Sequence, residues 1–279
     1  EVTRRGRETL GLMCRELEAR GVTLLEADTD GVYFAVPDSW TEGDERRVVA
    51  EVAALLPPLV QLELEGRYAA MLSHEPKNYA LLTYEGKLIL RGVAFRSSRS
   101  EPFGDHFLRR AVRALLEGDI AGVRDAYVET VGALRRRELP TYDVSSRVRM
   151  TKTPAQYLRT RAKRRELTYE AMLASSRDTW SIGDRARVYR TQSGSGAVVP
   201  EFDDEVTNAA SDSRDYDADY YVRLLKETFA ARLARAFRPD DFETLFADPA
   251  QLSLFTQGIS AIRPVLDERR SRNVGIDGE

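Results

Sequence analysis

Two aspartates one residue apart, Asp28 and Asp30, are the residues whose types and spacing most directly suggest chemistry. They belong to the stretch LLEADTDGVYF, residues 24–34, in which two apolar runs flank the acidic centre. Residues i and i+2 of a strand point to the same face, so the two carboxylates would lie side by side. Such like charges repel each other unless a cation lies between them. Mg²⁺ fits this pair, because it binds a few carboxylates and keeps water and phosphate oxygens as its other ligands.

Two other interpretations of the same stretch have to be weighed. A plain Asp-Gly hairpin tip explains the stretch equally well when it is taken alone. A calcium-binding EF-hand loop that begins at Glu26 would place its twelfth position on Pro37, which cannot supply the bidentate carboxylate required there. Its flanks would also be helices, whereas the flanks here are strand-like. The hairpin tip and the magnesium site therefore both stay open at this point.

The composition of the 279-residue chain, 42% hydrophobic and 31% charged, is that of a soluble globular protein. No apolar run approaches the roughly 20 residues that span a bilayer, so we expect no membrane association and a cytoplasmic location, at the nucleoid in a bacterium. The lone Cys14 excludes an intramolecular disulfide. One cysteine and two histidines are a poor basis for a zinc site, so any bound metal is expected to have oxygen ligands.

The net charge of −3 conceals a basic segment. Residues 135–190 contain 15 lysines and arginines against 6 aspartates and glutamates, whereas the segments before and after are acidic. This contrast is typical of a surface that binds a polyanion, although a solvated, charge-rich surface is the alternative. The phosphate contacts expected in this segment are Arg147, Arg149, Lys152, Arg161, Lys163, Arg164 and Arg165.

The hydrophobic pattern changes from mixed to mainly helical near residue 104, which predicts two domains and an α+β fold. The elements expected before this point are a helix over 3–20, a hairpin over 22–36, a helix from Thr41 and strands at 62–65, 79–84 and 87–93. Those expected after it are helices at 105–117, 120–138, 153–165, 168–175 and 219–237, a strand at 184–191 with its arginines on one face, and a loop over 192–215.

Four stretches in this order resemble the palm and thumb of family B DNA polymerases. The helix VTRRGRETL followed by LLEADTDGVYF is similar to the family's third catalytic motif, Tyr-Gly-Asp-Thr-Asp-Ser. LELEGRYAAMLSHEPKNYALL (62–82) is similar to a Leu-Glu-Leu-Glu strand followed by Lys-Lys-x-Tyr, and GKLILRGVAFRSSRSEP (86–102) to the strand that ends the palm. YDADYYVRLLKETFAARLARAF (216–237) resembles the Asp-x-x-Tyr-Tyr helix of the thumb. The resemblance implies an antiparallel-sheet palm portion over 1–104 and a mainly helical thumb over 105–279.

The resemblance also implies roles for individual residues. In the complete protein the activity would be DNA-directed DNA polymerase, with two Mg²⁺ ions promoting nucleotidyl transfer. Asp30 corresponds to the essential metal ligand and Asp28 to its supporting neighbour. Lys77 and Tyr79 correspond to residues that hold the primer terminus. The partners would be primer–template DNA, deoxynucleoside triphosphates and the N-terminal remainder of the polymerase, with the thumb gripping the duplex through its phosphates.

The sequence departs from the family pattern at several positions. Glu26 stands where the family has tyrosine, Pro76 replaces the first lysine of Lys-Lys-x-Tyr, and Ala94 replaces a glutamate. Ser97 aligns with an arginine of the family strand, and Arg96 is expected to substitute for it. Both aspartates are retained, so the departures indicate a divergent branch.

Several family motifs have no counterpart in this sequence. They are the first catalytic motif, the fingers helix that binds the triphosphate and the exonuclease carboxylates. We therefore expect a C-terminal part of a polymerase that does not polymerise by itself. A stand-alone, catalytically inactive DNA-binding module derived from a polymerase is the alternative. A nucleotidyl cyclase-like palm shares the paired carboxylates, but it explains neither the Tyr-Tyr helix nor the basic segment.

Overall fold

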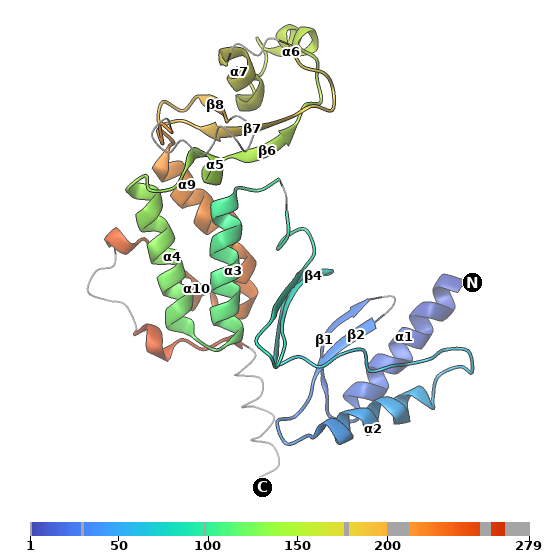
Figure 1. Ribbon diagram of the computed structural model, residues 1–279. Coiled ribbons are helices and arrows are strands. Elements are labelled where there is room, and N and C mark those ends of the chain that lie inside the picture. Colours follow the sequence, from blue (N-terminus) through green and yellow to red (C-terminus); the bar gives the residue numbers. More distant parts are fainter. Residues whose placement is uncertain are drawn as a thin grey trace. The chain divides into compact units, whose positions relative to one another are not determined.

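The computed structural model describes residues 2–28, 31–97, 99–175, 179–199, 212–251 and 258–265 (Figure 1). It consists of helices and three small antiparallel sheets, which confirms the predicted α+β class. The chain divides into two compact units after Gly92, and each is described by itself. The functional boundary at residue 104 stays a prediction. Among the described residues, no helix combines the length and the hydropathy that a membrane span requires.

The first unit begins with two helices that pack on a two-stranded hairpin. These elements are α1 (Val2–Glu18), β1 (Thr23–Asp28), β2 (Gly31–Ala35) and α2 (Glu42–Ala53). Leu17 and Val52, one from each helix, are buried in one core with Val22. Thr41 begins α2 with a capping box, in which its side chain and that of Asp44 each accept a hydrogen bond from the other's backbone N–H. The predicted hairpin and both predicted helices are confirmed.

A three-stranded antiparallel sheet completes the first unit. Its strands are β3 (Ala70–Glu75), β4 (Asn78–Leu82) and β5 (Leu88–Arg91), in that spatial order. The predicted strands at 79–84 and 87–93 are confirmed as β4 and β5, which end at Leu82 and Arg91, whereas β3 was not predicted. The strand predicted over 62–65 is wrong, because these residues pair with no described strand. Leu62 instead packs beside the core of the two helices.

A helical bundle forms the larger part of the second unit (Figure 1). Its helices are α3 (Pro102–Leu116), α4 (Ile120–Arg135), α9 (Ala218–Leu224) and α10 (Pro239–Leu245). The helix that begins with α9 continues as a π-helical turn over Leu225–Phe229 and a 3₁₀ segment over Ala230–Ala236, so the predicted helix over 219–237 is confirmed. Phe107, Tyr127 and Phe246 form edge-to-face contacts in the buried centre.

The third sheet, with short helices around it, completes the second unit. The strands are β6 (Ser146–Arg149), β7 (Arg185–Arg190) and β8 (Gly196–Val199), and the helices are α5 (Thr141–Val144), α6 (Pro154–Thr160) and α7 (Leu167–Ala174). Strand β7 was predicted, whereas β6 was not. Strand β8 corrects part of the predicted loop over 192–215, and residues 200–211 of that loop lie outside the described residues. Two short 3₁₀ helices, Pro249–Gln251 and Ile259–Ala261, follow α10.

Candidate nucleic-acid interface

Asp28, one of the two predicted catalytic residues, is the last residue of β1 and lies opposite Gly31 of β2. Its side chain is 35% exposed. Asp30, the predicted essential metal ligand, lies outside the described residues. The side-by-side arrangement of the two carboxylates therefore stays a prediction.

The ammonium group of Lys77 lies next to the Asp28 carboxylate, with 3.1 Å between Nζ and Oδ2. The lysine side chain is 72% exposed, and an exposed pair of this kind stabilises a fold by only about 0–1 kcal/mol. Its significance is positional, because it brings together a predicted catalytic carboxylate and a predicted primer-binding lysine from two separate hairpins.

The turn that carries Lys77 is held by a second carboxylate of β1. Strands β3 and β4 are joined by Pro76 and Lys77, with Glu75 opposite Asn78. Lys77 has a φ of 65°, the left-handed region that is usual for the third residue of a type II turn. One carboxylate oxygen of Glu26 accepts a hydrogen bond of 2.7 Å from the backbone N–H of Lys77.

Tyr79, the other predicted primer-binding residue, is fixed by Tyr33 of β2. The two phenol groups share a hydrogen bond of 3.0 Å, and their ring centroids are 5.0 Å apart. Burial, and then the hydrogen bond with Tyr79, raise the pKa of Tyr33 above its ordinary value. The phenol of Tyr33 therefore stays neutral near pH 7 and acts through hydrogen bonding.

The structure thus joins two hairpins of the first unit at two points: Lys77 contacts Asp28, and Tyr79 contacts Tyr33. Sequence reasoning missed the roles of Glu26 and Tyr33, which contact Lys77 and Tyr79. A signal for them was present, because Glu26 is two residues from Asp28 on the same strand, and an antiparallel hairpin places Tyr33 opposite Glu26.

The described residues do not form a complete magnesium site. Within these ranges no group of three or more His, Cys, Asp or Glu side chains is close enough to hold a metal ion. The Asp28 carboxylate is paired with the Lys77 ammonium. Mg²⁺ binding would need further ligands, among them Asp30, and stays a proposal for the complete protein.

In the second unit, strands β6 and β7 bring four arginines together in two cross-strand pairs. Arg147 lies opposite Arg187, and Arg149 lies opposite Arg185. Ala186 and Val188, which alternate with these arginines along β7, belong to the buried core on the other face of the sheet. Like charges directly opposite each other destabilise a sheet, so this arrangement indicates a surface suited to an anion.

The two arginine pairs differ in their surroundings. Arg187 lies 4.1 Å from the ring centroid of Tyr142 and donates a hydrogen bond of 3.2 Å to the backbone carbonyl of Ser145. Arg149 and Arg185 are exposed. The Arg149–Arg185 pair is therefore the more accessible one. Arg185 and Arg187 were not among the predicted phosphate contacts, although their alternation along the strand was noted.

Two of the predicted phosphate contacts are engaged within the fold. Lys152 forms an ion pair of 2.5 Å with Glu166, which precedes α7. Arg161 binds both carboxylate oxygens of Glu170, at 2.8 and 2.7 Å, and so joins the end of α6 to α7. Hydrogen bonds from Arg161 and then Tyr157 lower the pKa of Glu170 to about 2. These ion pairs compete with any contact to phosphate.

Four further predicted contacts are exposed. Lys163, Arg164 and Arg165 lie between α6 and α7, and no described carboxylate forms an ion pair with them. Arg96 is exposed in the second unit. DNA contact by these four residues stays a prediction.

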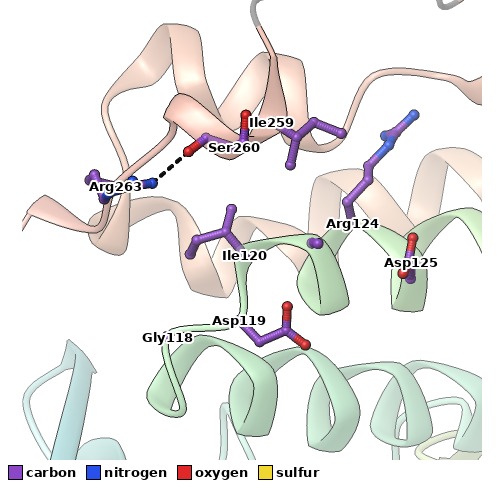
Figure 2. Close-up of a pocket in the computed structure, with 9 residues that line it drawn as sticks. Gly118, Asp119, Ile120, Arg124, Asp125, Ile259, Ser260 and Arg263 are labelled. Carbon is purple, nitrogen blue, oxygen red and sulfur yellow. Dashed lines mark hydrogen bonds between the residues drawn. The ribbon is translucent and has the colours of Figure 1, made fainter.

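A cavity of about 290 Å³ lies at the start of α4 (Figure 2). Among its charged groups, Asp119 caps α4, and Arg124 donates to the backbone carbonyls of Leu245, the last residue of α10, and Ala247, at 2.6 and 2.7 Å. Arg263 donates to the carbonyl of Ser260, as Figure 2 shows. None of the predicted site residues lines this cavity, so it does not enter the proposed interface.

Comparison with known proteins identifies relatives of the chain, although no family model matches it. A DNA polymerase of Pyrococcus horikoshii is 42% identical over 96 residues, which are 33% of this chain and 8% of that protein. DNA polymerase 1 of Pyrococcus abyssi is 32% identical over 143 residues, 50% of this chain and 18% of the relative. A DNA polymerase of Thermococcus sp. (strain 9oN-7) is 26% identical over 257 residues, 85% of this chain.

The chain is homologous to part of the archaeal DNA polymerases. It spans less than a third of each of these relatives, between 8% and 30% of their length. Among solved structures, the family B DNA polymerase of Pyrobaculum calidifontis matches with a TM-score of 0.57 at 16% sequence identity, over 90% of this chain and 29% of that one. The chain therefore has the fold of part of a family B polymerase, and the resemblance predicted from its motifs is confirmed.

Proposed function

We propose that this chain is the palm and thumb portion of a DNA-directed DNA polymerase, which holds the primer end and grips the product duplex. The observation that carries the proposal is the contact of the turn and strand that bear Lys77 and Tyr79 with the hairpin that bears Asp28, through the Lys77–Asp28 and Tyr79–Tyr33 pairs. In this assignment residues 1–104 serve as the palm portion and residues 105–279 as the thumb.

The first unit would hold the primer terminus. The exposed ammonium of Lys77 is a compact point charge suited to a phosphate or sugar oxygen. The phenols of Tyr33 and Tyr79 form a polar edge that can bond to acceptors in the minor groove. Those acceptors occur in A·T and G·C pairs alike, so such contacts would tolerate any sequence, as a polymerase requires.

The second unit would grip the duplex behind the primer end. Arginine binds phosphate with a planar, bidentate fork, and the exposed pair Arg149 and Arg185 offers two such groups at adjacent points of one sheet face. Contacts to phosphate position a protein on DNA without reading its sequence. The exposed residues Lys163, Arg164 and Arg165 would extend this surface.

Catalysis would require the complete protein. Asp30 and Asp28 would share Mg²⁺ with carboxylates supplied by the remainder of the polymerase, which would also bind the deoxynucleoside triphosphate. The bound metal would supply activation of the primer hydroxyl and neutralisation of the triphosphate charge. The chain alone is therefore expected to bind DNA without extending a primer, and a cytoplasmic location is part of the same proposal.

Fluorescence anisotropy with a labelled primer–template, titrated with salt, tests this function. We expect micromolar affinity at low salt, with a steep loss as salt rises, because counterions are released from each contacted phosphate. A primer-extension reaction with the chain alone should give no product. The absence of binding even at low salt, with the protein shown to be folded by circular dichroism, would refute the proposed DNA grip.

A second candidate is a catalytically inactive DNA-binding module, which the ion pair between Asp28 and Lys77 favours, because a lysine already neutralises the acidic residue. Primer extension by the full-length parent protein separates the two candidates. Activity that is lost in Asp30→Ala supports the polymerase, whereas a parent that binds DNA but never extends a primer supports the module.

A further inference from the structure

We infer that Glu26 is a positioning residue for the primer end: its carboxylate docks the Pro76-Lys77 turn onto β1 and thereby places the Lys77 ammonium beside Asp28. The inference rests on the proposed function of Lys77. It assigns a role to a position at which this sequence departs from the family pattern.

Both carboxylate oxygens of Glu26 are used to connect two hairpins. One accepts the hydrogen bond of 2.7 Å from the backbone N–H of Lys77, and the other accepts a bond of 3.1 Å from the hydroxyl of Ser73. The strands β1 and β3 belong to separate sheets, so no backbone ladder joins the two hairpins there. The side chain of Glu26 therefore links the hairpins at the turn itself.

The turn needs such support, because its conformation is unusual. Lys77 has a φ of 65°, which an L-residue with a side chain adopts at an energetic cost. A hydrogen bond to an ionised carboxylate is stronger than one between neutral groups, so the Glu26 contact can offset that cost. Gly92 leaves room for the turn, since a Cβ there would lie 2.2 Å from the Lys77 carbonyl oxygen.

Two further contacts join the hairpins, and neither holds the backbone of the turn: the exposed ion pair between Lys77 and Asp28 involves only side chains, and the tyrosine pair lies within the strands. Tyr33 fixes the phenol of Tyr79, which lies within β4 and pairs across the sheet with Ser73. That bond orients the strand but does not reach the backbone of the turn. Glu26 therefore holds the backbone of the turn from which the Lys77 side chain reaches Asp28.

A double-mutant cycle tests whether Glu26 acts through Lys77. The affinity of the 279-residue chain for a labelled primer–template is measured for wild type, Glu26→Ala, Lys77→Ala and the double variant. If Lys77 makes one phosphate contact, its removal should weaken binding about tenfold at about 50 mM salt. We expect Glu26→Ala to cause a similar loss and the double variant to be no weaker than Lys77→Ala.

Two further variants separate position from charge. Removing a negative charge should by itself strengthen binding to DNA. A loss of affinity in Glu26→Ala therefore cannot come from the change in charge and indicates a loss of position. Glu26→Gln keeps an acceptor oxygen for the Lys77 amide and should bind at least as tightly as wild type. Glu63→Ala removes an exposed carboxylate elsewhere in the same unit and should not weaken binding.

Hydrogen exchange of the Lys77 amide provides a readout that does not involve DNA. The amide should exchange faster in Glu26→Ala and stay protected in Glu26→Gln. Unchanged exchange in Glu26→Ala, or a loss of affinity that adds fully to that of Lys77→Ala, would overturn the inference while DNA binding stands. An unchanged affinity in Lys77→Ala would overturn the proposed role of Lys77, and the positioning role with it.

Discussion

The cross-strand arginines of the second unit allow function and stability to be tested in opposite directions. Arg149 and Arg185 face each other on β6 and β7, and both are exposed. Replacing both by alanine removes a repulsive pair, so the free energy of unfolding should stay unchanged or rise by up to about 1 kcal/mol. If each arginine contacts one phosphate, the slope of log affinity against log salt should fall in magnitude by about 1.8.

The slope change has a direct consequence in the binding assay. Between about 50 and 200 mM salt, wild type should lose about tenfold more affinity than the Arg149→Ala/Arg185→Ala variant. Anisotropy titrations at several salt concentrations measure the slope, and urea unfolding followed by circular dichroism measures the stability.

A matched control removes the same number of charges from the same unit. The double variant Lys152→Ala/Arg161→Ala breaks the ion pairs with Glu166 and Glu170, so it should lower the free energy of unfolding and change the salt slope less. An unchanged slope in the Arg149→Ala/Arg185→Ala variant would place the duplex surface elsewhere. A loss of more than about 1 kcal/mol of stability in that variant would show that its arginines serve the fold.

Two further predictions concern the second unit. Arg161 lowers the pKa of Glu170 to about 2, so the ionised Glu170 stabilises the fold fully above its unfolded pKa of about 4.3, and this contribution is lost as the pH falls towards 2. Thermal unfolding followed by circular dichroism between these pH values should therefore show a weaker pH dependence in Glu170→Gln; equal steepness in both proteins would contradict the ion pair. Gly104→Ala would place a Cβ 2.0 Å from the buried ring of Phe229 and should cost about 1–3 kcal/mol of unfolding free energy. An unchanged urea midpoint would contradict this packing.

Local signals in the sequence were sufficient for some elements and insufficient for others. Thr41, followed by acidic residues, predicted the start of α2, because an N-cap depends only on neighbouring residues. The alternation over 62–65 failed as a strand prediction, because a strand also requires a partner that alternation cannot reveal. Strand β6 was not predicted, because its arginines gave no strand signal. It forms a strand because it pairs with β7.

The same distinction applies to the candidate site. The motifs identified Asp28, Lys77 and Tyr79, and the structure pairs Lys77 with Asp28 and Tyr79 with Tyr33 of the same hairpin. Alternation along the hairpin places Glu26 and Tyr33 near Asp28, but their partners Lys77 and Tyr79 could not be predicted, because these contacts join hairpins whose relative placement is a property of the folded unit. Likewise, a count of basic residues cannot distinguish arginines that bind a carboxylate of the fold from those left for phosphate.

Hydrogen–deuterium exchange of the chain, measured by mass spectrometry with and without primer–template DNA at low salt, tests the central claim most directly. The account predicts slower exchange on DNA binding in peptides that cover the turn at 76–79 and the strands at 146–149 and 185–190. The helices α1 and α2 should remain unchanged and serve as an internal reference. Protection confined to α1 and α2, or DNA binding with no protection in the turn and the strands, would contradict the proposed interface.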